Sequence, residues 1–179
     1  MARTEIERAV LPSLLDRLTD ADPRTPADPP VSREESVRRF REGVMRDVEW
    51  LLNTRAPHDP LPPGLTGVGR SAYAYGLPDT TGLSGGTEAG RQQLLAWVTA
   101  AVAAFEPRLD ALHVELTGGG DLREPRVRFT LSALLRMDPS PEQVTFDTVL
   151  DLASGAYTLR GDAGDPNGGA AGAARGGGA

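Results

Sequence analysis

The sequence predicts an α+β domain in which two main helices pack on one face of a small antiparallel sheet of three to four strands. Two long segments, residues 33–55 and 87–105, repeat their apolar residues with the period of an α-helix. Beyond residue 109 the apolar period changes to two, as in strands. Strands with one apolar and one polar face are typical of an antiparallel sheet covered on one side only, and the two helices would supply that cover.

The first helix is predicted from about residue 33 to residue 55. Ser32 and Glu35 form a capping box at its start, and Pro57 follows its end. The second helix is predicted after Thr87, whose side chain suits an N-cap. It ends at Phe105, because a proline follows two residues later and cannot continue a helix.

The segment between these helices, residues 56–86, is rich in proline and glycine and is predicted to be a loop. Three of its apolar side chains are expected to anchor it on the core. They are Tyr73, Tyr75 and Leu77.

Four strands are predicted from alternating apolar and polar residues, at 109–117, 127–137, 144–152 and 156–160. Leu134 is the one residue that breaks the alternation. An exposed edge strand offers unpaired backbone groups that another chain can complete by adding a strand of its own. The first and the last of these strands are the two alternatives for such an edge.

Length and composition predict one folded domain with a further segment at each end. Residues 1–31 form an N-terminal amphipathic peptide and a proline-rich linker, residues 32–160 the domain, and residues 161–179 a tail rich in glycine and alanine. The tail has nothing to bury, so we expect it to be disordered. No apolar run is long enough to cross a bilayer and no export signal is evident, which points to the cytoplasm.

Charge and residue usage narrow the classes of function. A formal net charge of -6 argues against nucleic acid or an anionic membrane as the main partner. The chain has no cysteine, which removes disulfides and thiolate metal sites, and its two histidines lie far apart in the sequence. We therefore expect neither a metal nor another cofactor.

The N-terminal peptide carries apolar residues at near-helical spacing across residues 4–20, including Leu14, Leu15 and Leu18. Pro12 interrupts this pattern, so at most two short helical pieces are predicted. Such a peptide either folds back on the domain or binds a partner, and the proline-rich linker favours the partner.

The junction between the second helix and the first strand, Glu106, Pro107 and Arg108, is here called the elbow. Pro107 stops the helix and restricts the residue before it, so the chain turns a stiff corner. The opposite charges of Glu106 and Arg108 either pair with each other or bind something outside the molecule.

An enzymatic interpretation would make Glu106 the general acid of a glycoside hydrolase. Arg108 argues against it, because a nearby cation favours the ionised carboxylate whereas a general acid needs the opposite. The second carboxylate could be Asp79, Asp110 or Glu115, and nothing in the sequence selects one. We therefore predict no enzymatic activity.

Four motifs in order, at residues 12–18, 50–55, 75–79 and 105–109, resemble those of TssE, the type VI secretion baseplate subunit family. A hairpin at 144–157 adds to the resemblance, which covers roughly residues 12–160. TssE belongs with the lysozyme-like wedge proteins of contractile-phage baseplates. The Glu-Pro-Arg signature of that family corresponds to Glu106, Pro107 and Arg108.

The resemblance implies a structural baseplate component that binds the wedge proteins TssF and TssG and helps to template the contractile sheath of TssB and TssC. It also implies a cytoplasmic baseplate docked at the inner membrane complex. Two alternatives stay open, a peptidoglycan-cleaving lysozyme-like enzyme and a regulatory module resembling an anti-adaptor. The predicted partner-binding residues are the elbow and four residues of the N-terminal peptide, namely Leu14, Leu15, Arg17 and Leu18.

Overall fold

The computed structural model describes residues 9–19, 24, 31–57, 64–65, 67–80, 87–119 and 126–161. Its described helices are α1 (Leu14–Leu18), α2 (Arg33–Asn53) and α3 (Glu88–Phe105), with short 3-10 helices η1 (Val68–Arg70) and η2 (Ala72–Ala74). The strands are β1 (Leu109–Gly119), β2 (Arg126–Leu135), β3 (Glu142–Asp151) and β4 (Ala156–Gly161). The predictions for most of the proline-rich linker and for the tail after residue 161 lie outside the described residues.

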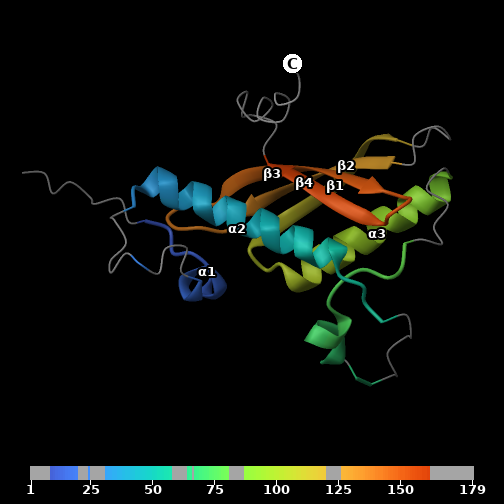
Figure 1. Cartoon of the computed structure of the whole chain (residues 1–179), viewed down its shortest axis with the longest axis horizontal. Coiled ribbons are helices and arrows are strands. Elements are labelled where there is room, and N and C mark those ends of the chain that lie inside the picture. Colours follow the sequence, from blue (N-terminus) through green and yellow to red (C-terminus); the bar gives the residue numbers. More distant parts are fainter. Residues whose placement is uncertain are drawn as a thin grey trace, which may run out of the picture.

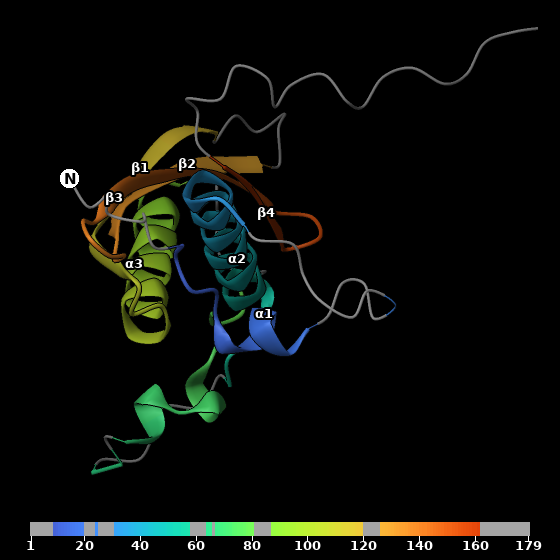
Figure 2. The ribbon, with the colours of Figure 1, turned by 90° about the vertical axis from the view of Figure 1, so that its left-hand side faces the viewer.

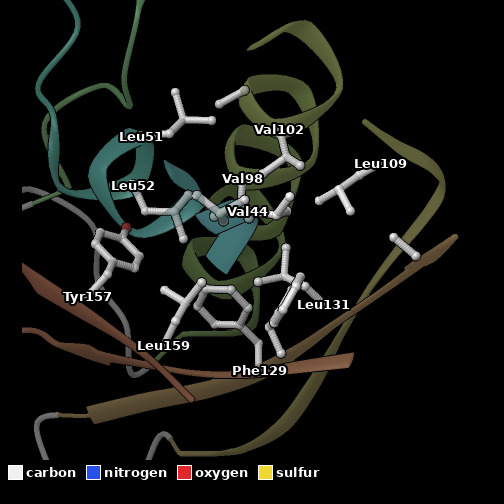
Figure 3. Close-up of a cluster of buried hydrophobic side chains, with 14 of the residues drawn as sticks. Val44, Leu51, Leu52, Val98, Val102, Leu109, Phe129, Leu131, Tyr157 and Leu159 are labelled. Carbon is white, nitrogen blue, oxygen red and sulfur yellow. The ribbon is translucent and has the colours of Figure 1, made fainter. Parts of the chain in front are cut away.

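The four strands form one antiparallel sheet in the order β1-β2-β3-β4, and α2 and α3 run along one of its faces (Figure 1). The side chains between these layers point toward one another (Figure 3). Val44 and Val98 from the helices and Phe129 from the sheet are fully buried there. Along β2 buried and more exposed residues alternate, and Leu134 lies on the outer face with 40% of its surface exposed. The predicted α+β fold is confirmed.

The N-caps predicted at Ser32 and Thr87 are present, whereas the Glu35 carboxylate of the predicted capping box accepts hydrogen bonds from Arg38 and Arg39. The Ser32 side chain accepts a hydrogen bond from the Glu35 amide at 3.2 Å, and the Thr87 side chain accepts one from the Gly90 amide at 3.1 Å. Helix α2 ends at Asn53 rather than at residue 55, because Thr54 is already extended.

The loop before α3 is anchored by two of the three predicted residues. Leu77 is buried, and the Tyr75 ring lies edge-on to Phe105 with 5.4 Å between ring centroids. The prediction for Tyr73 is wrong, because it lies in η2 and 53% of its surface is exposed. In Figure 1 the segment containing η1 and η2 projects away from the sheet.

The two strands proposed as edges are the two edges of the sheet, and they differ. On β4, the Asn53 side chain bonds both the amide and the carbonyl of Tyr157 at 2.9 Å, and Glu49 accepts a bond from the Leu159 amide at 3.4 Å. On β1, the register shifts between Asp110 and His113 and again between Leu116 and Gly118. Edge β4 is therefore covered by α2 side chains, whereas edge β1 is interrupted by two irregularities.

The N-terminal peptide is helical only over α1 among its described residues, where the spacing predicted up to two helical pieces. It lies on the side of α2 away from the sheet (Figure 2). The Val10 amide donates a 2.9 Å hydrogen bond to the Ser36 hydroxyl of α2. The peptide thus does fold back on the domain, but no residue of α1 is buried.

Candidate functional site

The elbow turns the chain within three residues. The Glu106 amide donates the last hydrogen bond of α3, to the Val102 carbonyl at 2.9 Å. The Glu106 carbonyl then accepts a 3.1 Å hydrogen bond from the Leu109 amide, where β1 begins. Pro107 between them is exposed. The helix stop predicted from the proline is confirmed.

Glu106 and Arg108 pair with each other across the elbow. Glu106 is only 5% exposed. Its Oε1 accepts hydrogen bonds from the Arg108 Nε at 2.5 Å and the Arg108 amide at 3.3 Å, and its Oε2 accepts one from Arg108 Nη2. This bidentate arrangement is the strongest form of carboxylate–guanidinium pairing. Of the two alternatives for these charges, the structure realises the internal pair.

A second carboxylate, Asp47 of α2, holds the same guanidinium. Arg108 Nη2 donates to Asp47 Oδ2 at 2.7 Å, and the guanidinium carbon lies 5.9 Å from the centre of the Phe40 ring. The other oxygen of Asp47 accepts bonds from Arg46, at 2.7 Å from Nη2 and 3.1 Å from Nε. Asp47 thereby joins the elbow to the exposed side of α2.

The same arrangement continues from α2 to α1. Arg46 Nη1 donates to Asp16 Oδ1 at 2.6 Å, and the Ser13 hydroxyl donates to Asp16 Oδ2 at 2.6 Å. Five side chains of alternating charge therefore form one network that reaches from the elbow to α1. We call it the elbow–α1 network, and its members are Glu106, Arg108, Asp47, Arg46 and Asp16.

The pKa shifts within the network favour the charged forms. Hydrogen bonding to Glu106 raises the pKa of Arg108 above its usual range; burial opposes this rise, and Asp47 adds to it. Partial burial disfavours the charge on Asp16, but hydrogen bonds from Arg46 and Ser13 outweigh it and lower its pKa. Both shifts thus favour the charged forms of Arg108 and Asp16.

The network includes residues that the sequence pattern did not indicate, namely Asp47, Arg46 and Asp16. The sequence feature that could have indicated this contact is Gly43. Glycine in the interior of a helix is unfavourable unless another group must approach the backbone closely. Gly43 is buried, and a Cβ on it would lie 3.1 Å from Asp16 Oδ2. The glycine therefore marks the place where α1 meets α2.

The predicted partner-binding residues of α1 lie on its outside. Leu14, Leu15 and Leu18 are exposed by 69%, 48% and 75%, and Arg17 is exposed as well. Together with Pro107 they form the accessible part of the predicted site, whereas Glu106 is its buried part. That these residues bind a partner stays a prediction.

The geometry suits a structural joint better than an acid catalyst. Both carboxylate oxygens of Glu106 are occupied by Arg108, so neither is presented to a substrate. A depression of about 470 Å³ lies beside the elbow, lined by Asp110, Arg136, Met137, Asp138 and Pro141. Glu106 is not part of that lining.

Within the part of the chain that the structure describes, no helix has the length and apolar character needed to cross a membrane. Residues 38–140, more than half of the 179 residues, match the family of the baseplate wedge protein gp25. No curated protein and no solved structure matches the chain. The family match includes the elbow and most of α2, and it leaves α1 outside. Members of this family are structural components of baseplates. The motifs, the fold and this match together place the chain in the baseplate wedge protein gp25 family.

Proposed function

We propose that this protein is a structural subunit of a type VI secretion baseplate that binds the wedge proteins TssF and TssG and helps to template the sheath of TssB and TssC. The observation that carries this proposal is the elbow, a family signature that folds into a cross-linked corner with Pro107 on its outside. Such an assembly would work in the cytoplasm, where the baseplate docks at the inner membrane complex.

The elbow supports a binding role because its shape is fixed before any partner arrives. Two carboxylates from different elements hold the Arg108 guanidinium, so the corner cannot change its angle without breaking ion pairs. A rigid surface loses little conformational entropy on association. Arg108 keeps 23% of its side chain exposed, enough to reach a partner group while it stays paired with Glu106.

The sheet supports the sheath-templating role through its β1 edge. On β4, the outward amides of Tyr157 and Leu159 already have partners on α2, so an incoming strand would have to displace them. Within the described residues, α2 and α3 provide no comparable side-chain bond to the backbone of β1. An added strand would therefore pair with β1, over the regular stretch between its two irregularities.

The elbow is tested by capture of purified TssF–TssG complex on the immobilised full-length chain. Arg108→Ala removes a group of the elbow itself, whereas Asp47→Asn weakens the same network from α2 without altering the elbow residues. Both variants are expected to melt earlier, because each leaves a partly buried charge with a poorer partner. Arg108→Ala is expected to lose capture by at least tenfold at equal amounts of folded protein, and Asp47→Asn by less, because it leaves the elbow residues themselves in place.

Arg38→Ala is the matched control, since Arg38 is an exposed arginine of α2 that pairs with Glu35 of the same helix. It is expected to leave both melting and capture unchanged. Wild-type capture by folded Arg108→Ala would show that the elbow only locks the helix–strand corner. A fall in the turbidity of cell walls on addition of the wild-type chain would instead favour the lysozyme-like alternative.

A further inference from the structure

The polar and apolar sides of helix α1 are reversed relative to those of an ordinary surface helix. A surface helix packs its apolar stripe on the core and leaves its polar face in water. In α1 the polar residue Asp16 is bonded to Arg46 of α2, whereas Leu14, Leu15 and Leu18 are exposed. Leu11, just before the helix, is 74% exposed as well. We call these four leucines the leucine surface.

The contacts of α1 fix this unusual orientation. Asp16 accepts bonds from Arg46 of α2 and from Ser13, which also caps the helix by accepting a 3.2 Å bond from the Asp16 amide. Gly43 makes the approach possible, because a Cβ there would press on the Asp16 carboxylate at 3.1 Å. Glycine is the least favourable residue in a helix interior after proline. Close docking of α1 is the one feature of the described structure that accounts for Gly43.

An exposed aromatic side chain of α2 is linked to α1 through Arg46. Trp50 is 51% exposed, and its ring lies 5.0 Å from the Arg46 guanidinium carbon. Arg46 therefore touches both Asp16 of α1 and this tryptophan. Four exposed leucines within one short segment are more than the isolated apolar residues that every protein surface carries.

We propose that the leucine surface is a docking site for an apolar groove between helices of the same wedge partner that contacts the elbow. Leucines on one side of a helix are the usual anchors for such grooves. Continuity favours the same partner, because Asp47 bonds both Arg46, which anchors α1, and Arg108 of the elbow.

The charge beside the leucine surface indicates the kind of groove that the partner would present. Asp16, the acidic group of α1, is already neutralised by Arg46, whereas Arg17 is exposed and makes no ion pair with a described acidic residue. Arg17 thus adds one exposed positive charge beside the leucines, on a chain whose net charge is -6. A groove with acidic residues at its border complements it. This inference rests on the proposed function, since it places the leucine surface in the same wedge interface.

The test compares three variants of the full-length chain in capture of purified TssF–TssG complex. The double variant Leu14→Glu with Leu18→Glu is expected to lose capture at least tenfold with an unchanged melting temperature, because these side chains are exposed. Gly43→Ala is expected to lower capture without melting earlier, since alanine favours α2 but forces the Asp16 carboxylate, 3.1 Å from the new Cβ, to shift. Leu134→Glu, a partly exposed leucine on the outer face of the sheet, is the matched control and is expected to bind normally.

The outcomes separate this inference from the proposed function. If the wild-type chain captures TssF–TssG and the double leucine variant captures it equally well, the inference is wrong and the proposed function stands. Failure of the wild-type chain to capture the complex overturns both. A dimer by light scattering that the leucine variant abolishes would assign the surface to a second copy, and wild-type binding to anionic vesicles that the variant loses would assign it to lipid. Either result overturns the inference.

Discussion

Gly76 has a positive φ of 117° at the point where the loop before α3 joins the end of α2. The next residue, Leu77, forms a short parallel bridge there, in which its amide donates to the Thr54 carbonyl at 2.9 Å. A Cβ on Gly76 would lie 2.4 Å from that same carbonyl oxygen. Only glycine satisfies both the backbone angle and the close approach.

Gly76→Ala is therefore expected to lower the free energy of unfolding by about 3 kcal/mol, from backbone strain and from the clash with Thr54. Denaturant unfolding followed by circular dichroism measures the loss. Gly64→Ala is the matched control, because Gly64 also has a positive φ, of 93°, but among the described residues no atom beyond its chain neighbours lies within 4 Å of its Cβ position. Equal losses for the two variants would show that the contact with Thr54 adds nothing.

Single residues also show where prediction from sequence ends. Tyr73 and Tyr75 look alike in the sequence as loop anchors, yet only Tyr75 packs against the core. Their difference arises from η2, which turns Tyr73 outward, and no local pattern specified that short helix. Ala111 is similar, because its positive φ of 51° belongs to an irregularity in β1 that depends on pairing with β2.

Among the elements, α2 and α3 could be predicted closely and α1 could not. The ends of α2 and α3 depend on local chemistry, the caps Ser32 and Thr87 and the stop at Pro107, which a sequence displays directly. The orientation of α1 depends on an ion pair with Arg46, thirty residues away in the chain. Sequence spacing identified the leucines of α1 but not the side on which they lie.

The docking of α1 on α2 is expected to weaken at acidic pH. Asp16 has a lowered pKa in the folded chain, so its ion pair contributes stability that is fully present above its ordinary value of 3.8. That contribution is lost as the pH falls below 3.8 through the folded-state pKa. The pair is partly exposed and contributes only about 0.2–1 kcal/mol, enough to hold a short helix but not the domain.

Amide NMR signals of α1 are therefore expected to move toward random-coil positions below pH 3.8, while those of β2 keep their dispersion. Asp16→Asn should produce the same α1 signals at neutral pH, because the amide has no charge to pair with Arg46. Signals of α1 that stay unchanged in this variant would mean that contacts other than the ion pair hold the helix.

For the molecule as a whole, the elbow–α1 network joins three elements that the sequence separates widely. The elbow could be found from its sequence, since proline between opposite charges is a local pattern. Asp47 could not, because a carboxylate within a polar helix face is ordinary until the fold brings it to within 2.7 Å of Arg108. The site thus combines a local motif with a tertiary contact, and only the first half can be predicted from sequence alone.

A partner strand can extend the sheet at β1 or at β4, and cross-linking distinguishes the two edges. A strand added to β1 would lie about 4.8 Å away, within reach of a short cross-linker on a neighbouring side chain. The chain contains neither cysteine nor lysine, so a single cysteine treated with a cysteine-to-amine reagent reacts almost only with amines of a partner. Glu115 on β1 and Thr158 on β4 are both exposed and provide matched positions.

With TssB–TssC as partner, Glu115→Cys is expected to give a cross-linked product on gel electrophoresis, and Thr158→Cys is expected to give none. The physical reason is that Asn53 and Glu49 already occupy the outer edge of β4, whereas β1 has no such cover on α2 or α3 within the described residues. Products from Thr158→Cys alone would mean that the incoming strand displaces those side chains and extends the sheet beyond β4. Products from neither position would mean that the sheath does not extend this sheet.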